Sequence, residues 1–273
     1  MTQYSTDFAD SDHVPNYEPP DWTPRWHGDD SGAPSVISIE NDSTGSSFGE
    51  QILFQDQVGS TQDCAFSWDD VGAVADADVL MRLRWPGVSA NYYYSGPVVR
   101  GDEDSSGEIG YVLRVNKSTG IMSVWSFPGP TQIASVYLLP PIVHDVQKDY
   151  TANEQWHWVR FQVRGTAIKA RIWLDGDAEP SAWDIDITDS SITDAGWVGL
   201  HSRSKDCEVD WMGVGTVLDD APAPPASEGI AQVTQQAIEV LREGAPQARV
   251  TQIAVEVLRQ NRRHHGGGVI IIG

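Results

Sequence analysis

The chain contains very little cysteine. Cys64 and Cys207 are the only two in 273 residues, and neither has the CxxC spacing of a metal-ligand pair. Two cysteines are too few for a disulfide scaffold, so we expect two buried free thiols. The sequence also lacks a run of about 18 apolar residues, so we expect no membrane-spanning segment.

Positive charge is scarce as well. Lys and Arg number 18 against 39 Asp and Glu, which gives a formal net charge of −21. Residues 229–273 hold five Arg and three Glu, or +2, so the rest of the chain carries −23. A field of that sign repels nucleic acid and anionic lipid, so we expect neither nucleic acid nor a membrane as a partner. The simplest interpretation of the acidity is solubility.

The beginning of the chain, MTQYSTDFADSD, lacks the basic start and apolar stretch of a secretory signal. We therefore expect a protein that acts where it is made or leaves the cell inside a released particle. Common catalytic signatures are missing too. The sequence has no GxSxG, HExxH or P-loop, and its seven His show no ligand spacing.

What the chain has in abundance is two-residue alternation, which is typical of strands. In the run QWHWVRFQVRG, Val159, Phe161 and Val163 share one strand face, and Trp158, Arg160 and Gln162 share the other. Similar runs, cut by polar turns, extend from about residue 35 to residue 215. The pattern predicts an all-β protein, an antiparallel sandwich. The residues predicted for its core are Val159, Phe161, Val163, Ile172 and Val198.

The composition divides the chain into four parts. Residues 1–34 are expected to form an irregular N-terminal arm, because Pro19, Pro20 and Pro24 oppose helix and central strand. The other parts are a β-sandwich domain at residues 35–218, a Pro/Ala linker at residues 219–228 and a C-terminal repeat and attachment segment at residues 229–273.

The C-terminal segment contains an internal repeat. VTQQAIEVLR begins at Val233, and VTQIAVEVLR begins at Val250, 17 residues later. Helix and strand both fit, and the β-branched residues of the second copy favour strands. Such short units cannot bury an apolar face alone, so we expect them to dock on another chain, on each other or on the sandwich. The residues predicted for assembly contacts are Val250, Ile253, Val255, Val257, Ile270 and Ile271, and for the final GGGVIIIG a loose tail is the alternative.

Three features together resemble one known class of protein. They are the acidic start with PPDWTPRW, the block WHWVRFQVRGTAIKARIWLDG…GWVGLHS, and the VTQxxxEVLR repeats. The class is the structural proteins of tailed bacteriophages that carry a concanavalin A-like, laminin-G-like jelly-roll domain, and the resemblance covers most of the chain. The jelly-roll pattern occurs equally in lectin modules and glycan hydrolases, whereas the repeats indicate a virion. The resemblance implies synthesis in the host cytoplasm, a place in the virion and other virion proteins as partners.

Jelly-roll glucanases of this superfamily carry a strand motif E-[ILV]-D-x-x-E, whose two Glu are nucleophile and acid/base. The chain has Glu208, Val209 and Asp210 of this motif, but Gly213 stands in place of the second Glu. Double displacement needs a carboxylate pair about 5–5.5 Å apart, which this motif cannot supply. We therefore expect no enzyme activity and no catalytic residue.

The candidate binding site is formed by the aromatic and polar residues on the non-aliphatic strand faces. Sugars stack on aromatic rings, and their hydroxyls take hydrogen bonds from polar side chains. Trp–Arg stacks that serve only packing, and a protein contact, are the alternatives. The candidate glycan-binding residues are Arg114, Trp125, Trp158, Arg160, Arg171, Trp173 and the loop residue Tyr93, with Gln162 and His201 beside them.

We therefore predict a non-enzymatic structural component of a phage particle, such as a fibre, spike or decoration subunit. It would form a homo-oligomer and contact host-surface polysaccharide. The alternatives are a glycan-binding or glycan-hydrolysing enzyme of the same fold, and a purely structural subunit without a ligand. We expect no cofactor, and Ca²⁺ at the carboxylates of GDEDSSGE is the alternative.

Overall fold

The computed structural model describes residues 3–8, 19–27, 36–41, 51–56, 63–85, 94–104, 107–116, 120–138, 156–203 and 207–224. This part of the chain forms fifteen strands and a short 3-10 helix, η1 (Asp69–Val71). No helix in these residues is long and apolar enough to cross a membrane. The strands are β1 (Gln3–Thr6), β2 (Trp22–His27), β3 (Val36–Asn41), β4 (Gln51–Asp56), β5 (Asp63–Trp68), β6 (Ala77–Arg84), β7 (Tyr94–Asp104), β8 (Gly107–Asn116), β9 (Ile121–Phe127), β10 (Thr131–Tyr137), β11 (His157–Arg164), β12 (Ala167–Leu174), β13 (Ile185–Thr188), β14 (Trp197–Arg203) and β15 (Cys207–Thr216).

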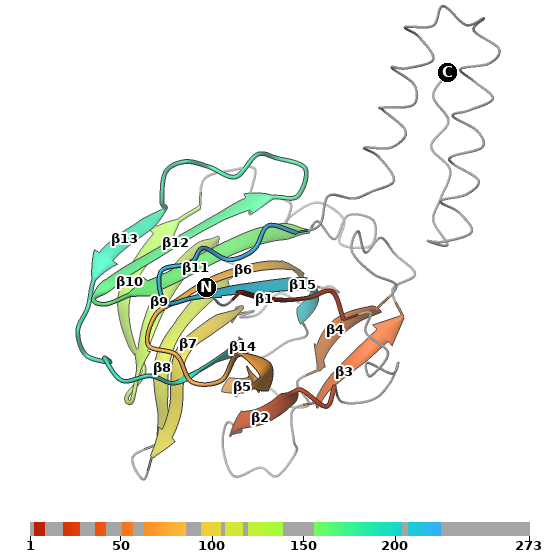
Figure 1. The fold of residues 1–273 in the computed structure, drawn as a ribbon. Helices are drawn as coiled ribbons and strands as arrows, with labels where there is room; N and C mark the ends of the chain where they lie inside the picture. Colours follow the sequence, from red (N-terminus) through yellow and green to blue (C-terminus); the bar gives the residue numbers. More distant parts are fainter. Residues whose placement is uncertain are drawn as a thin grey trace, which may run out of the picture.

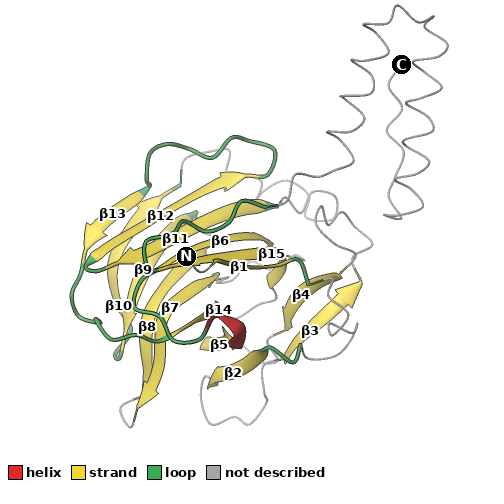
Figure 2. Ribbon diagram, in the orientation of Figure 1, coloured by secondary structure: helices red, strands yellow, loops and turns green. Residues whose placement is uncertain are grey.

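The strands form two antiparallel sheets that pack face to face (Figures 1 and 2). Sheet A has the order β13-β12-β11-β6-β15-β4-β3, and β1 also pairs with β15. Sheet B has the order β10-β9-β8-β7-β14-β5-β2. The chain crosses repeatedly between the sheets, for example from β5 to β6 and back to β7, as is typical of jelly rolls. The predicted all-β antiparallel jelly-roll sandwich is therefore confirmed.

The main core lies between the two sheets and follows from alternation along each strand. Val159, Phe161 and Val163 on β11 all point into it and are completely buried. Ile172 on β12 and Val198 on β14 belong to the same core and are 1% and 0% exposed. All five residues predicted for the core therefore lie in it.

The two cysteines also lie in this core. Cys64 and Cys207 are free and completely buried, as the sequence predicts. The Cys64 Sγ donates a hydrogen bond to the carbonyl oxygen of Ser202 at 3.4 Å. Both thiols therefore behave as small apolar core residues.

The described residues of the predicted N-terminal arm are not irregular. β1 pairs with β15 in sheet A, and β2 pairs with β5 at the edge of sheet B. Pro24 is tolerated in β2 because an edge strand has one side without ladder bonds, and the register shifts between Pro24 and Trp26. Trp22 and Trp26 are buried, at 3% and 1% exposed. This segment is therefore part of the sandwich, which corrects the predicted arm.

The first residues of the predicted Pro/Ala linker pack on the outer face of sheet A. Ala221 is 6% exposed and lies in an apolar cluster with Leu80 and Trp211. Its backbone N–H donates to Asp78 Oδ2 at 3.2 Å. The sandwich therefore extends past residue 218. The C-terminal repeats, with Val250, Ile253, Val255, Val257, Ile270 and Ile271, lie outside the described residues.

Candidate functional site

The predicted glycan-binding residues do not form one surface. Arg114 on β8 and Trp125 on β9 belong to sheet B, whereas the candidates on β11 and β12 belong to sheet A. Each set points away from the core between the sheets, so the two sets lie on opposite outer faces of the sandwich. The sheet A candidates are Trp158, Arg160, Arg171 and Trp173. Tyr93 lies outside the described residues.

The tryptophans of sheet A form a packed apolar layer. Trp158 and Trp173 lie directly opposite each other on β11 and β12. Their rings are nearly parallel, and the ring centres are 6.4 Å apart. Trp211 on β15 meets Trp158 edge-on at 5.7 Å. The side chains of Trp158 and Trp173 are only 7% and 6% exposed, and Ala221 closes the same cluster. These rings offer little surface to a sugar.

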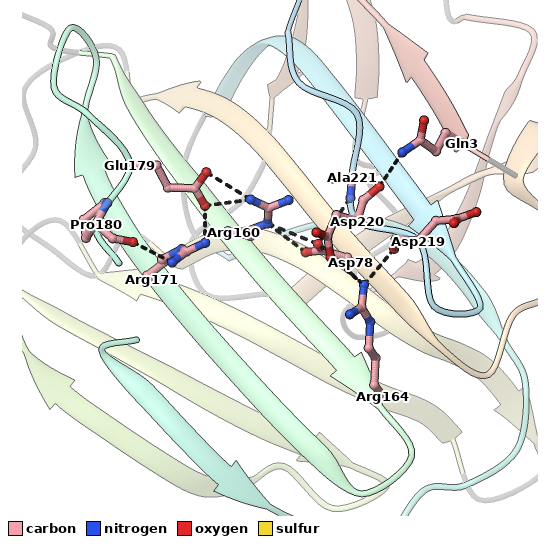
Figure 3. A network of polar contacts seen from close by, with 10 residues as sticks. All are labelled: Gln3, Asp78, Arg160, Arg164, Arg171, Glu179, Pro180, Asp219, Asp220 and Ala221. Atoms are coloured by element: carbon pink, nitrogen blue, oxygen red, sulfur yellow. Dashed lines mark hydrogen bonds and ion pairs between the residues drawn. The ribbon is translucent and has the colours of Figure 1, made fainter. Parts of the chain in front are cut away.

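The arginines of sheet A are held in a polar network that also fixes the end of the described chain (Figure 3). Arg160 donates from Nε to both carboxylate oxygens of the fully buried Asp78, at 3.1 Å each. Arg160 and Arg171 share Glu179, and Arg164 bonds the carbonyl oxygen of Asp219 at 2.7 Å. Burial alone would lower the pKa of Arg160, but its bonds with Asp78 and Glu179 outweigh burial and raise it. The guanidinium therefore stays charged and serves packing.

The carboxylates of the partial glucanase motif form ion pairs on the same outer face of sheet A. Glu208 pairs with Arg84, and the completely buried Asp210 pairs with Arg82. Arg82 also bonds Asp175 at 2.8 Å. Each acid group that the motif retains is therefore neutralised by an arginine in a buried setting.

The position of the missing second Glu is filled by an aromatic ring. A Cβ added at Gly213 would lie 2.4 Å from the Trp211 indole and 3.0 Å from Pro222. Even alanine would therefore be too large here without a shift of neighbouring atoms. The geometry explains why glycine stands at this point of β15.

The outer face of sheet B has a different arrangement. The Arg114 guanidinium lies 4.6 Å from the centre of the Trp125 ring, and its terminal nitrogen is 3.4 Å from His201 Nε2. Trp26 packs against Trp197 and against His201, with ring centres 5.3 and 6.2 Å apart. Arg114 and Trp26 are each 1% exposed, whereas Trp125 and Trp197 are partly exposed. Accessible aromatic surface therefore lies at the margins of this face.

A hollow of about 340 Å³ lies at one end of sheet B. It is bounded where β2, β5, β7 and β14 reach the same end, next to η1 (Figure 2). The hollow has aromatic, cationic and acidic side chains together with glycine backbone. Its lining residues are Arg25, Trp68, Asp69, Gly72, Ala73, Gly101, Asp102, Ala195, Gly196 and Trp197.

The polar wall of the hollow is a connected set of side chains. Arg25 donates from Nε to Ser67 Oγ at 2.9 Å and lies 3.5 Å from Asp69 Oδ1. Asp69 also accepts hydrogen bonds from Ser67, at 2.5 Å, and from Thr23. Arg25 and Asp69 remain 38% and 37% exposed, so both can still meet a ligand.

The aromatic wall is fixed by close backbone packing. Trp197 lies flat on Gly101, since a Cβ at Gly101 would lie 2.3 Å from the indole. Gly196 packs equally tightly on the Gly101 carbonyl oxygen, and it forms a two-way backbone bridge with Val74. Side chains at either glycine would push the walls apart, so these positions set the shape of the hollow.

A buried arginine ties the two loops of the hollow together. Arg100 is 2% exposed and donates to the carbonyl oxygens of Ala75, at 2.5 Å, and of Ile192. The Tyr111 hydroxyl in turn accepts from the backbone N–H of Ile192 at 3.1 Å. These bonds hold residues 72–75 against residues 192–196, so the hollow is preformed.

Asp189 anchors the beginning of the second loop. It accepts hydrogen bonds from Tyr111 and Ser191, both at 2.5 Å. Burial alone would raise the pKa of Asp189, but the bonds from Ser191 and Tyr111 outweigh burial and lower it. Burial, followed by the bond to Asp189, raises the pKa of Tyr111. The carboxylate is therefore stabilised in its charged form.

Metal binding finds no support in the described part of the chain. No group of three or more His, Cys, Asp or Glu there is placed to hold a metal ion. The carboxylates of GDEDSSGE lie at the ends of β7 and β8, where Glu103 is opposite Glu108. Asp102 turns its carboxylate to the backbone N–H of Glu103 at 2.8 Å.

Sequence reasoning missed the hollow because its residues are dispersed along the chain. Trp197 lies in GWVGLHS and Arg25 lies in PPDWTPRW, about 170 residues away. Both segments resemble the phage proteins, but neither has a binding-site pattern of its own. Gly196 and Gly199, on either side of Trp197 in the sequence, were a signal for this region. Glycine in or beside a strand often marks a place where another backbone segment comes close.

No family model and no curated protein sequence matches the chain. Among solved structures, it is similar to carbohydrate binding module CBM66 from Bacillus subtilis, with 14% identity over 69% of this chain and 91% of that chain and a TM-score of 0.44. The VIP36 exoplasmic/lumenal domain in its Ca²⁺/Man3GlcNAc-bound form gives 11% identity, 79% and 92% coverage and a TM-score of 0.44. A glycoside hydrolase family 16 endo-glucanase from Bacteroides ovatus gives 9% identity, 78% and 99% coverage and a TM-score of 0.47. Similarity at this level assigns neither a ligand nor an activity.

Proposed function

We propose that this protein is a non-catalytic glycan-binding subunit of a bacteriophage particle, and that the hollow at the end of sheet B binds a neutral sugar. The observation that carries the proposal is the meeting of the Trp197 ring with the Arg25 and Asp69 side chains around one preformed hollow. Its volume of about 340 Å³ falls at the lower end of the range for ligand sites.

The chemistry of the hollow suits a sugar ring. Trp197 supplies a flat aromatic surface on which the C–H face of a pyranose can stack. Arg25 supplies hydrogen-bond donors, and Asp69 supplies acceptors for hydroxyl groups. Because the walls are already held in place, a ligand would not have to order them, which favours binding.

The charge of the hollow favours neutral over anionic sugars. Asp69 and Asp102 together outweigh Arg25, and the whole chain carries −21. A carboxylate or phosphate on the ligand would therefore meet net repulsion. We expect uronate-rich and phosphorylated polysaccharides to bind less well than neutral ones.

Binding without cleavage is supported by the state of the β15 motif. Glu208 and Asp210 are paired with Arg84 and Arg82, and Trp211 fills the space beside Gly213. A retaining hydrolase needs two accessible carboxyl groups about 5–5.5 Å apart. We expect no new reducing ends after incubation with bacterial surface polysaccharides. Cleavage that is lost in Glu208→Gln would show that this part of the proposal is wrong.

The setting in a phage particle is supported by the sequence resemblance and by the VTQxxxEVLR repeats, which lie outside the described residues. The glycan would then belong to the surface of the host, and the particle would supply many copies of a weak site. Antibody labelling of purified particles tests this setting directly. Particles that carry no copy of the chain would contradict it.

The binding proposal is tested by titrating the full-length protein with a panel of neutral and anionic bacterial surface polysaccharides. Trp197→Ala and Arg25→Gln should each weaken binding by about tenfold or more, which corresponds to roughly 1.4 kcal/mol. Trp183→Ala is the matched control, because Trp183 is also partly exposed but packs on Arg171 of sheet A. Trp125→Ala tests the partly exposed ring that packs on Arg114.

Three outcomes would contradict the assignment of the hollow. The first is a wild-type protein that binds no member of the panel. The second is equal binding by wild type, Trp197→Ala and Arg25→Gln. The third is a loss of binding in Trp125→Ala alone, which would return the site to the predicted Arg114 and Trp125 pair.

A further inference from the structure

Sheet B ends in an edge strand with little protection. β10 pairs with β9. Within the described residues β13 of sheet A lies close to β10, but no strand forms backbone hydrogen bonds with the other side of β10. Such an edge presents unpaired backbone N–H and C=O groups, which natural proteins guard with charge, proline, bulges or a short length. β10 is seven residues long, TQIASVY, and contains no charged residue and no proline.

Two other edges of the sandwich are better guarded. β13 at the end of sheet A has four residues and carries Asp186, which is exposed. β2 at the far end of sheet B contains Pro24 and a register shift. β10 has a register shift between Gln132 and Ala134, but from Ala134 to Tyr137 its pairing with β9 is regular. The second half of β10 is therefore open to extension of the sheet.

The charge distribution shows which partner fits this edge. A chain with a net charge of −21 repels its own copies over most of its surface. Residues 118–143, however, contain no Asp, Glu, Lys, Arg or His at all. Two copies can therefore approach through β10 without placing like charges opposite each other.

The exposed side chains of β10 are also suited to contact. Thr131, Gln132 and Ser135 are exposed, and Tyr137 is 75% exposed. Exposed Tyr is common in protein interfaces, because its ring adds apolar area and its hydroxyl can bond a partner. The residues between these positions, Ile133, Ala134 and Val136, are uncharged and pack against the core.

We propose that β10 pairs antiparallel with β10 of a second copy of this chain, which joins the two seven-stranded sheets edge to edge. An antiparallel pair of identical strands has two-fold symmetry, so the same patch serves both copies and the assembly closes as a dimer. A seven-residue strand pair buries less than the roughly 1,200 Å² of a standard interface. The dimer is therefore reversible and concentration-dependent.

Sedimentation velocity of the full-length protein over a wide concentration range tests the proposal. The wild type should show a concentration-dependent doubling of mass. Ser135→Glu and Ser135→Lys should both abolish that doubling, because either places like charges together across the two-fold axis. Using both signs separates edge pairing from a general effect of charge, since Lys alone would favour association of acidic chains.

Ser5→Glu provides the matched control, because Ser5 is an exposed serine on β1, which pairs with β15 in the other sheet. It should sediment as the wild type does, and all three variants should keep the wild-type thermal midpoint. In a second measurement, Ser135→Cys should be linked into dimers by a short bis-maleimide, whereas Ser5→Cys should not. The native Cys64 and Cys207 are buried and do not react.

The sedimentation results test the β10 dimer even if another part of the chain also forms oligomers. If residues beyond 224 also assemble, Ser135→Glu should reduce the mass of the particle to that of the assembly which those residues form alone. A wild type that is monomeric at all concentrations would overturn the proposal and leave a different protein as the partner of this edge. An oligomer whose mass Ser135→Glu and Ser135→Lys leave unchanged would also overturn it. Neither result depends on whether the hollow binds a sugar.

Discussion

The buried ion pair between Asp78 and Arg160 gives the most specific stability prediction. Asp78 is 0% exposed and sits on β6 in the middle of sheet A, where Arg160 bonds both of its oxygens. Arg160→Met removes the main partner and leaves the carboxylate with Arg164, 3.9 Å away, and the N–H of Ala221. Breaking a buried pair in this way costs about 3–5 kcal/mol, because the buried carboxylate loses the two hydrogen bonds from its main counter-charge.

The reverse change should cost less. Asp78→Leu removes the buried carboxylate, and Arg160 keeps its two bonds to Glu179, at 2.7 and 3.0 Å, which is partly open to solvent. In the double variant Asp78→Leu, Arg160→Met neither charge remains. Since apolar residues of similar volume often replace a buried pair without loss, the double variant should be more stable than Arg160→Met alone.

Urea denaturation followed by tryptophan fluorescence measures these differences. Lys169→Met is the control, because its pair with Asp186 at 3.1 Å is solvent-exposed and should contribute at most about 1 kcal/mol. A loss below about 1 kcal/mol for Arg160→Met, or simple additivity in the double variant, would refute the reasoning. In that case a water molecule or a shifted side chain supplies the hydrogen bonds that the Asp78 carboxylate loses in Arg160→Met.

Three further predictions concern the core, the loop beside the hollow and the end of the chain. Phe161→Ala should destabilise the protein by about 3–5 kcal/mol in the same assay, because the ring is fully buried; a loss below about 1 kcal/mol would show that the strand faces are assigned wrongly. Asp189 has a lowered pKa in the folded state, so its charge stabilises the fold above the unfolded pKa of about 3.9, and this advantage disappears as the pH falls through the folded pKa. The stability difference between wild type and Asp189→Asn should therefore shrink below about pH 4, and a constant difference in acid titrations would contradict the role of the charge. Truncation after Pro224 should leave a folded sandwich that no longer enters its particle, whereas unfolding in circular dichroism or normal incorporation would contradict the attachment role.

The fold could be predicted because the alternation of apolar and polar residues along a strand shows which side chains are buried. On β11 the apolar residues at every second position face the core, and the sequence shows them without help from distant segments. The N-terminal strands could not be predicted in this way. β2 contains Pro24, which argues against a strand unless the strand lies at a sheet edge, and only the tertiary fold shows that it does.

The candidate site was harder because alternation does not identify which sheet a strand joins. Trp125 and Trp158 have the same sequence appearance, yet they lie on opposite outer faces of the sandwich. The hollow combines residues from Arg25 to Trp197, and its walls are made largely of glycine backbone. Side-chain patterns cannot predict such a site, because its shape depends on how four strand ends meet.

The two outer faces of the sandwich are built differently. On sheet A, arginines and carboxylates are paired, tryptophans are packed, and residues 219–222 lie across the face. The described chain therefore ends on the sheet A side, whereas Trp197 and the hollow belong to sheet B. An attachment segment that follows residue 224 starts away from the hollow. Because β10 closes yet another side, a dimer through that strand would leave both hollows accessible. The three proposed roles, attachment, self-association and sugar binding, would therefore not compete for the same surface.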